Sequence, residues 1–156
     1  MSTYADTSFL VSLYVLDANS ALAANQMKQA KLPILLTPFG ELELVNALFL
    51  RLFRKELVPS KVKAAYALLR SDIEGGVFQL KPLSAGVYER AKQIARRRTP
   101  QLGTRTLDVL HVASAVLLQA DTFFTFDRDQ GKLAKAEGLR VHPEFQRLIE
   151  EGERKG

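Results

Sequence analysis

Short apolar runs alternate with longer amphipathic stretches along this chain, and that order limits the folds open to it. Residues 33–37 (PILLT) and 122–127 (TFFTFD) are typical of buried strands, and residues 3–6, 77–80 and 139–141 are weaker strand candidates. Helix-forming residues at amphipathic spacing separate these runs. Such an order is typical of βαβ units, in which helices connect parallel strands. The sequence therefore predicts an α/β fold around a mostly parallel sheet of four or five strands.

Local signals place the ends of several helices. Thr37 and Pro38 suit an N-cap and a first helical residue. The helix after them carries an apolar stripe made of Leu44, Leu48, Phe49, Leu52 and Phe53. A later helix over residues 84–98 is expected to end before Pro100, because proline disfavours helical backbone in the residue before it. Thr104 or Thr106 can then cap the helix that follows.

Size and composition indicate one compact domain. At 156 residues the chain is expected to bury about 69% of its unfolded surface. We assign the domain to residues 1–141 and interpret residues 142–156 as a terminal helix or frayed tail. The chain has no cysteine, which excludes disulfides, thiolate zinc sites and thiol catalysis. Without a signal peptide or an apolar run near the ~18 residues that span a bilayer, we expect a cytoplasmic protein that makes no membrane contact.

The positive charge is concentrated in the middle of the sequence. Residues 51–105 carry thirteen Lys and Arg against four acids, a net charge of +9 in a chain whose total is +5. Clustered cations attract polyanions such as nucleic acids, although solvated helix faces are the simpler explanation from charge alone. The candidates for phosphate contacts are Arg51, Arg54, Lys55, Arg96, Arg97, Arg98 and Arg105.

Four acids are expected to meet at one edge of the predicted sheet. Asp6 ends the first strand, and Asp127 ends the strand at 122–127. Asp108 lies in the first turn of the helix that precedes the strand at 122–127, and Glu43 lies in the helix that follows PILLT. In a parallel sheet the ligand site lies outside the carboxyl ends of the strands. Crowded carboxylates repel each other unless a cation lies among them. Mg²⁺ or Mn²⁺, which prefer oxygen ligands, fit such a set.

Each acid also has a structural interpretation. Asp108 can simply interact with a helix dipole, and Glu43 can be a surface acid. Asp127 and Asp129 can be turn residues, and Asp6 can be the N-cap of the first helix. These alternatives stay open at the level of the sequence.

Two further polar residues lie close to the acids in sequence. Ser8 can cap the first helix instead of Asp6, or hold a metal-bound water. His111, one turn after Asp108 on an apolar face, is interpreted as a buried core histidine whose hydrogen bonds are satisfied. Its only possible histidine partner is His142, and without an HxxxH spacing a zinc site is disfavoured.

Four motifs in order carry a family resemblance. They are Asp6-Thr7-Ser8, Glu43-x-x-Asn46-Ala47-Leu48, Gly103-Thr104-Arg105-Thr106-Leu107-Asp108-x-x-His111-x-Ala113 and Thr125-Phe126-Asp127. From Tyr4 to about Val141 the chain resembles the PIN-domain nucleases, in particular their VapC-type toxin branch. The resemblance implies a three-layer α/β/α fold in which the acids matching Asp6, Glu43, Asp108 and Asp127 hold Mg²⁺ or Mn²⁺ for RNA cleavage. Asp129 resembles an additional acid of some members.

The resemblance also suggests roles and partners. We expect Asp6 and Asp108 to contact the metal most directly, Glu43 to orient or deprotonate the water, and Asp127 to complete the site or act through water. Ser8, Arg105, Arg51 and Arg97 are the candidate substrate-binding residues. Toxin-like members pair with a small antitoxin protein and commonly form homodimers, for which the apolar helices at 44–53 and 62–69 offer surfaces.

Two other functions stay open. A PIN-type nuclease can act in RNA maturation or decay without being a toxin, and a PIN-like module can bind RNA or protein without catalysis. The presence of all four acids argues against the inactive module. The phosphate-binding motifs GxxxxGK[ST] and GxGxxG are both absent from the sequence, so a nucleotide-binding phosphotransferase is disfavoured.

Overall fold

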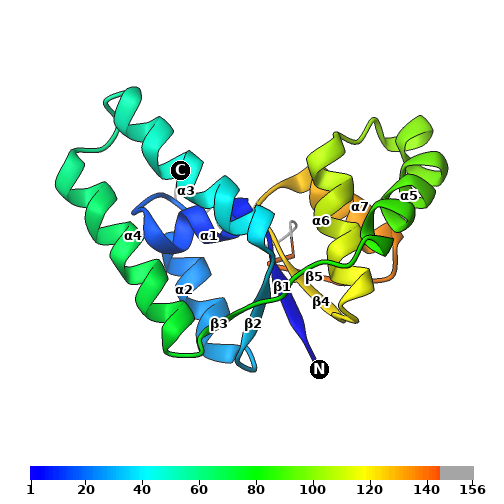
Figure 1. Cartoon of the computed structure of the whole chain (residues 1–156), viewed down its shortest axis with the longest axis horizontal. Helices are drawn as coiled ribbons and strands as arrows, with labels where there is room; N and C mark the ends of the chain where they lie inside the picture. Colours follow the sequence, from blue (N-terminus) through cyan, green and yellow to red (C-terminus); the bar gives the residue numbers. More distant parts are fainter. Residues whose placement is uncertain (145–156) are drawn as a thin grey trace.

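The computed structural model describes residues 1–144, which form a three-layer α/β/α fold (Figure 1). Five parallel strands lie in the order β3-β2-β1-β4-β5. Their bounds are β1 Thr3–Ala5, β2 Ile34–Leu36, β3 Phe78–Leu80, β4 Thr122–Phe124 and β5 Arg140–His142. The predicted α/β fold and parallel sheet are confirmed, with residues 77–80 supplying an edge strand as expected.

Seven helices connect the strands within residues 1–144. They are α1 Thr7–Tyr14, α2 Ser20–Gln29, α3 Pro38–Phe53, α4 Pro59–Glu74, α5 Gly86–Leu102, α6 Thr106–Leu117 and α7 Arg128–Ala136. Helices α1 to α4 cover one face of the sheet and α5 to α7 the other (Figure 1). Neighbouring strand residues therefore enter different cores.

The two-residue period of the strands divides their side chains between the two cores. Tyr4, Leu35 and Phe123 pack with α5, α6 and α7. Ala5 and Phe124, each one residue further on, pack with the helices of the opposite face. Because both faces of the sheet are covered, its central strands β1, β2 and β4 are mainly apolar. The polar residues that follow them are thereby left at the carboxyl edge.

The predicted N-cap of α3 is confirmed. The Thr37 hydroxyl accepts a hydrogen bond from the Gly40 backbone N–H at 3.1 Å, with Pro38 in the first turn. Asp6 caps α1 in the same way, since its carboxylate accepts from the Phe9 N–H at 2.9 Å. The structural interpretation of Asp6 is thus correct, and it is compatible with a role at the site.

The predicted end of α5 is wrong, because the helix continues through Pro100 to Leu102. Proline removes only one N–H donor there, close to the end of the helix, and other contacts hold the last turn. Arg98 donates to the Ala136 carbonyl and to Glu137, both at the end of α7. Gly103 then ends the helix with φ 63°, and its N–H donates to the Thr99 carbonyl.

Neither predicted threonine caps α6. The N-cap position is Arg105, whose side chain makes no capping hydrogen bond, and Thr106 is the first helical residue. The Thr104 hydroxyl instead lies 2.6 Å from the Thr99 hydroxyl. The last strand was predicted at 139–141, whereas β5 covers Arg140–His142, and His142 pairs with Phe124. Most of the expected tail, residues 145–156, lies outside the described residues.

Candidate active site

Asp6 lies at the carboxyl edge of the central strand β1 and is buried, with 1% of its surface exposed. One carboxylate oxygen accepts hydrogen bonds from the Ser8 hydroxyl (2.7 Å) and the Phe9 N–H, and the other accepts from the Thr125 hydroxyl. Burial raises the pKa of Asp6, and the charge of His111 together with these hydrogen bonds offsets only part of the rise. A buried carboxylate of this kind favours a nearby cation.

Thr125 connects Asp6 to Asp127. Its hydroxyl oxygen accepts from the Asp127 N–H at 2.9 Å while the hydroxyl donates to Asp6. Asp127 also caps α7, because one carboxylate oxygen accepts from the N–H groups of Asp129 and Gln130, both at 3.0 Å. The turn interpretation of Asp127 is therefore correct as well, and its second oxygen faces Arg105.

Arg105 joins Asp127 to Asp108. Its guanidinium donates to a carboxylate oxygen of each acid, at 3.1 Å in both cases. Asp108 is buried in the first turn of α6, whereas the Arg105 side chain is 74% exposed. The hydrogen bond to Asp108, followed by the charges of Asp108 and Asp127, raises the pKa of Arg105. Two acids from different elements thus share one exposed cation.

Glu43 approaches from α3 and is held by α1 and α6. Its carboxylate accepts from the Thr7 hydroxyl at 2.9 Å and from His111 Nε2. Desolvation raises the pKa of Glu43, but the hydrogen bond and charge of His111, with the hydrogen bond from Thr7 and the charge of Arg105, outweigh it and lower the pKa below its usual range. Glu43 is therefore ionised at neutral pH, and a surface role does not describe it.

His111 is the functional neighbour that sequence reasoning undervalued. It is buried with its hydrogen bonds satisfied, as interpreted, but its partners are Glu43 on one side and the Tyr4 hydroxyl, 2.7 Å from Nδ1, on the other. Burial, more than any other cause, raises the pKa of Tyr4, so its hydroxyl keeps its proton. The sequence did contain a sign that His111 lies near the acids. It is three residues after Asp108, a spacing that puts both side chains on one face of α6.

The other predicted site residues lie apart from this network of hydrogen bonds or at its rim. Asp129 is exposed in the first turn of α7, and only its backbone N–H bonds to Asp127. Arg51 pairs with Glu56 at 3.4 Å beyond the end of α3, and Arg97 pairs with Glu137. Of the four predicted substrate-binding residues, Ser8 and Arg105 contact the candidate acids directly.

The oxygen ligands at the carboxyl edge of the sheet suit Mg²⁺ or Mn²⁺. In this structure, however, the acidic side chains are held by hydrogen bonds to one another's neighbours. Within residues 1–144, no three His, Asp or Glu side chains are grouped so as to hold a metal ion. Arg105 supplies the positive charge between Asp108 and Asp127. Arg105 is exposed but Asp108 is buried, so separating them leaves a buried carboxylate without a partner unless another cation takes the place of Arg105. The chemistry of the donor set, carboxylates and hydroxyls, suits a divalent ion in that place.

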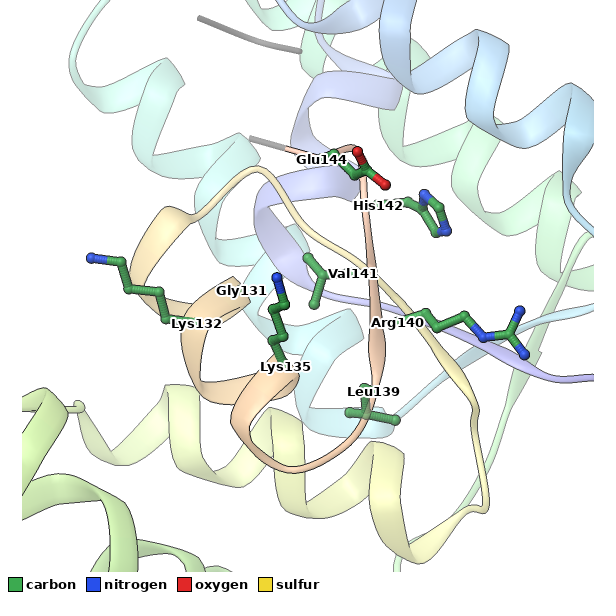
Figure 2. A pocket seen from close by; sticks show the side chains of 8 residues that line it. All are labelled: Gly131, Lys132, Lys135, Leu139, Arg140, Val141, His142 and Glu144. Carbon is green, nitrogen blue, oxygen red and sulfur yellow. The ribbon is translucent and has the colours of Figure 1, made fainter. Parts of the chain in front are cut away.

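A separate pocket of about 600 Å³ lies between α7 and β5, at the edge of the sheet (Figure 2). Lys132 and Lys135 of α7 and Arg140 of β5 line it. Figure 2 shows Lys135 pointing toward Val141, while Arg140 extends from the opposite side of the strand and Lys132 points away. These cations do not converge on one point and do not form a single anion site.

The chain belongs to the PIN domain family, whose model matches residues 3–136. That range includes all four predicted acids, and it confirms the resemblance seen in the sequence motifs. No curated protein sequence matches the chain. In addition, no helix within residues 1–144 is long and apolar enough to cross a membrane.

Solved structures share this fold at low sequence identity. VapC20 of Mycobacterium tuberculosis, described as a toxin that cleaves the sarcin–ricin loop, matches with a TM-score of 0.68 and 20% identity, over 91% of this chain and 100% of its own. FitAcB of Neisseria gonorrhoeae matches with a TM-score of 0.63 and 18% identity, over 89% and 95%. The PAE2754 protein of Pyrobaculum aerophilum gives 0.61 and 18%, over 90% and 89%. The TM-scores show a common fold, and the low identities carry no conclusion beyond it.

Proposed function

We propose that this PIN domain is a metal-dependent endoribonuclease that hydrolyses RNA phosphodiester bonds in the cytoplasm as the toxin of a toxin–antitoxin pair. The observation that carries the proposal is the linked set of acids at the carboxyl edge of the sheet. Asp6, Asp127 and Asp108 are joined through Thr125 and Arg105. Helix capping accounts for one contact of Asp6 and of Asp127, but it does not account for the buried Asp108 or for the shared Arg105.

Asp6 and Asp108 are the acids that we assign to the most direct contact with Mg²⁺ or Mn²⁺, with Glu43 and Asp127 completing the site and Asp129 as a further acid at its rim. When bound, a divalent ion supplies an activated water and neutralises charge on the phosphate in the transition state. Glu43, ionised and held by Thr7 and His111, orients the attacking water or takes its proton. Ser8 keeps Asp6 in place from the side of α1.

Cations around the acids complete the substrate site in this proposal. Arg105 is exposed and lies beside two of the acids, so it can exchange its carboxylate partners for an RNA phosphate when a metal binds. Arg51 and Arg97 extend the contact along the basic segment. RNA as the substrate class is supported by the toxin VapC20, which shares the fold and is described as cleaving an RNA loop.

The proposed partners are a small antitoxin protein and a second copy of this chain. Support comes from apolar side chains that the core does not use. Phe49 and Phe53 lie one turn apart on α3 and are 49% and 83% exposed, and Val58 follows just before α4. Exposed apolar surface of this kind marks protein interfaces.

A cleavage assay of the purified chain on total RNA, with Mg²⁺, Mn²⁺ or EDTA, tests the enzyme function. We expect cleavage with either ion and none in EDTA. Asp108→Asn keeps the shape of the side chain and removes its charge, so cleavage should fall by orders of magnitude while folding is kept.

Asp121→Asn is the matched control for this assay. Asp121 precedes β4 at the opposite edge of the sheet, and its contact with the Thr122 hydroxyl (3.0 Å) survives the change to an amide. This variant should keep wild-type activity. Wild-type cleavage by a folded Asp108→Asn variant would rule out Asp108 as a metal ligand.

A further inference from the structure

A buried chain of hydrogen bonds reaches Glu43 from inside the core. Tyr4 on β1 is fully buried, and its hydroxyl lies 2.7 Å from His111 Nδ1 and 3.3 Å from the Thr37 hydroxyl. His111 Nε2 in turn bonds to Glu43. Strand β1 and helices α3 and α6 are thus tied together behind one candidate active-site acid.

We propose that Tyr4 and His111 are positioning residues, which fix the Glu43 carboxylate at the metal site through this chain of hydrogen bonds. The inference rests on the proposed metal-dependent function. An ionised carboxylate only accepts hydrogen bonds, so His111 carries a hydrogen on Nε2 whether its ring is neutral or protonated. The Tyr4 hydroxyl pairs with Nδ1 in either form, donating to a neutral ring and accepting from a protonated one. Tyr4 therefore fixes the orientation of the ring that holds Glu43.

Gly40 packs the first turn of α3 against the same polar groups. It lies three residues before Glu43. A Cβ there would lie 3.1 Å from the Thr37 hydroxyl, which is tighter than usual, and at ordinary van der Waals distance from His111 Cε1 (3.6 Å) and the Tyr4 hydroxyl (3.9 Å). The start of α3 is thus in close contact with the Tyr4–His111 pair.

A purely structural role makes a different prediction. If Tyr4 and His111 only satisfy each other in the core, their removal lowers stability and leaves the metal site unchanged in the folded fraction. If they act through Glu43, their removal weakens metal binding only while Glu43 is present. A double-mutant cycle separates the two.

The experiment measures Mn²⁺ affinity by titration calorimetry on the intact chain, with folding checked by circular dichroism. We expect Tyr4→Phe and His111→Leu to weaken Mn²⁺ binding by about 10–100-fold, as removal of a group that orients a metal ligand usually does. His111→Gln, whose amide N–H can still donate to Glu43, should recover most of the loss. In a Glu43→Ala background, His111→Leu should have no further effect.

Two results would overturn the inference alone. One is unchanged Mn²⁺ affinity in folded Tyr4→Phe and His111→Leu, and the other is an equal loss from His111→Leu with and without Glu43. If His111→Leu does not fold, Tyr4→Phe and its cycle with Glu43→Ala decide. A wild-type chain that binds no Mn²⁺ and cleaves no RNA would instead overturn the proposed function, and the inference with it.

Discussion

Asp6 and Asp127 each make a helix-capping contact and a second contact within the network of acids. This explains why the sequence allowed two interpretations of each. Asp6 caps α1 and also accepts from Ser8 and Thr125. Asp127 caps α7 with one oxygen and meets Arg105 with the other. A capping carboxylate is held at a helix N-terminus in a fixed orientation, so the cap places the acid for its second contact. The structural and functional interpretations are therefore not in competition.

Asp6→Asn is expected to stabilise the metal-free protein at neutral pH. The folded pKa of Asp6 is raised, so its favourable contribution is present below the unfolded pKa of about 3.9 and is lost as pH rises through the folded pKa. Thermal melts in EDTA should show a higher Tm for the variant at pH 7 and little difference near pH 4. In Mn²⁺ the order should reverse, because only the wild type gains from the ion. A lower Tm at pH 7 in EDTA would contradict this account.

Arg105→Ala is expected to raise the affinity for Mn²⁺ and to lower the affinity for RNA. Without the competing guanidinium, Mn²⁺ should bind more tightly, because the ion no longer has to displace Arg105 from two carboxylates. RNA should bind more weakly, and the slope of log affinity against log salt should fall by about 0.7 for one lost phosphate contact. Calorimetry and filter binding at several salt concentrations measure these effects. Weaker binding of Mn²⁺ and RNA alike would show that Arg105 instead supports the site structurally.

The start of α3 was easier to predict than the end of α5. The Thr37 cap depends on residues three apart, which a sequence displays directly. The extension of α5 past Pro100 depends on Arg98 reaching α7, a contact about forty residues away in sequence. The acids at the site divide in the same way. Asp6 and Asp127 followed from strand ends, whereas the contact of His111 with Glu43 needs α3 and α6 to meet across β1.

Gly103 is the residue on which the start of helix α6 depends. Its φ of 63° is left-handed, and it lies in the short connection that leads through Arg105 into the first turn of α6, which holds Asp108. Gly103→Ala should cost about 1–2 kcal/mol, which lowers Tm by about 2–8 °C and weakens Mn²⁺ binding through misplacement of Asp108. Gly86→Ala, at the start of α5 with the Ser84 hydroxyl 3.5 Å from the added Cβ, is the control and should leave both unchanged or slightly raise Tm. Equal losses in both variants would remove the special role of position 103.

At the scale of the whole molecule, the strand order explains why the acids gather where they do. The chain leaves β1 toward α1 on one face of the sheet and leaves the neighbouring β4 toward α7 on the other face (Figure 1). The two connections diverge at the carboxyl edge between β1 and β4, which is where open α/β sheets bind their ligands. Asp6 follows β1, and Asp127 follows β4. Neither the strand order nor this divergence can be read from motifs, although the family resemblance implies them.

Self-association is the remaining whole-molecule prediction, and it follows from apolar surface at the far end of α3. Phe49 and Phe53 continue the stripe that Leu44 and Leu48 begin, but only the latter two are buried in the core. In Figure 1 the α3–α4 corner extends away from the sheet, so a second copy can reach it without covering the acids.

Sedimentation velocity should show a dimer that a Phe49→Ser/Phe53→Ser variant loses, whereas Tyr88→Ser, on the exposed surface of α5, should remain dimeric. RNA cleavage per chain should be nearly unchanged, because every residue assigned to catalysis comes from one copy. A wild-type monomer at high concentration would leave this apolar face to the antitoxin, and loss of the dimer in Tyr88→Ser alone would place the contact on α5.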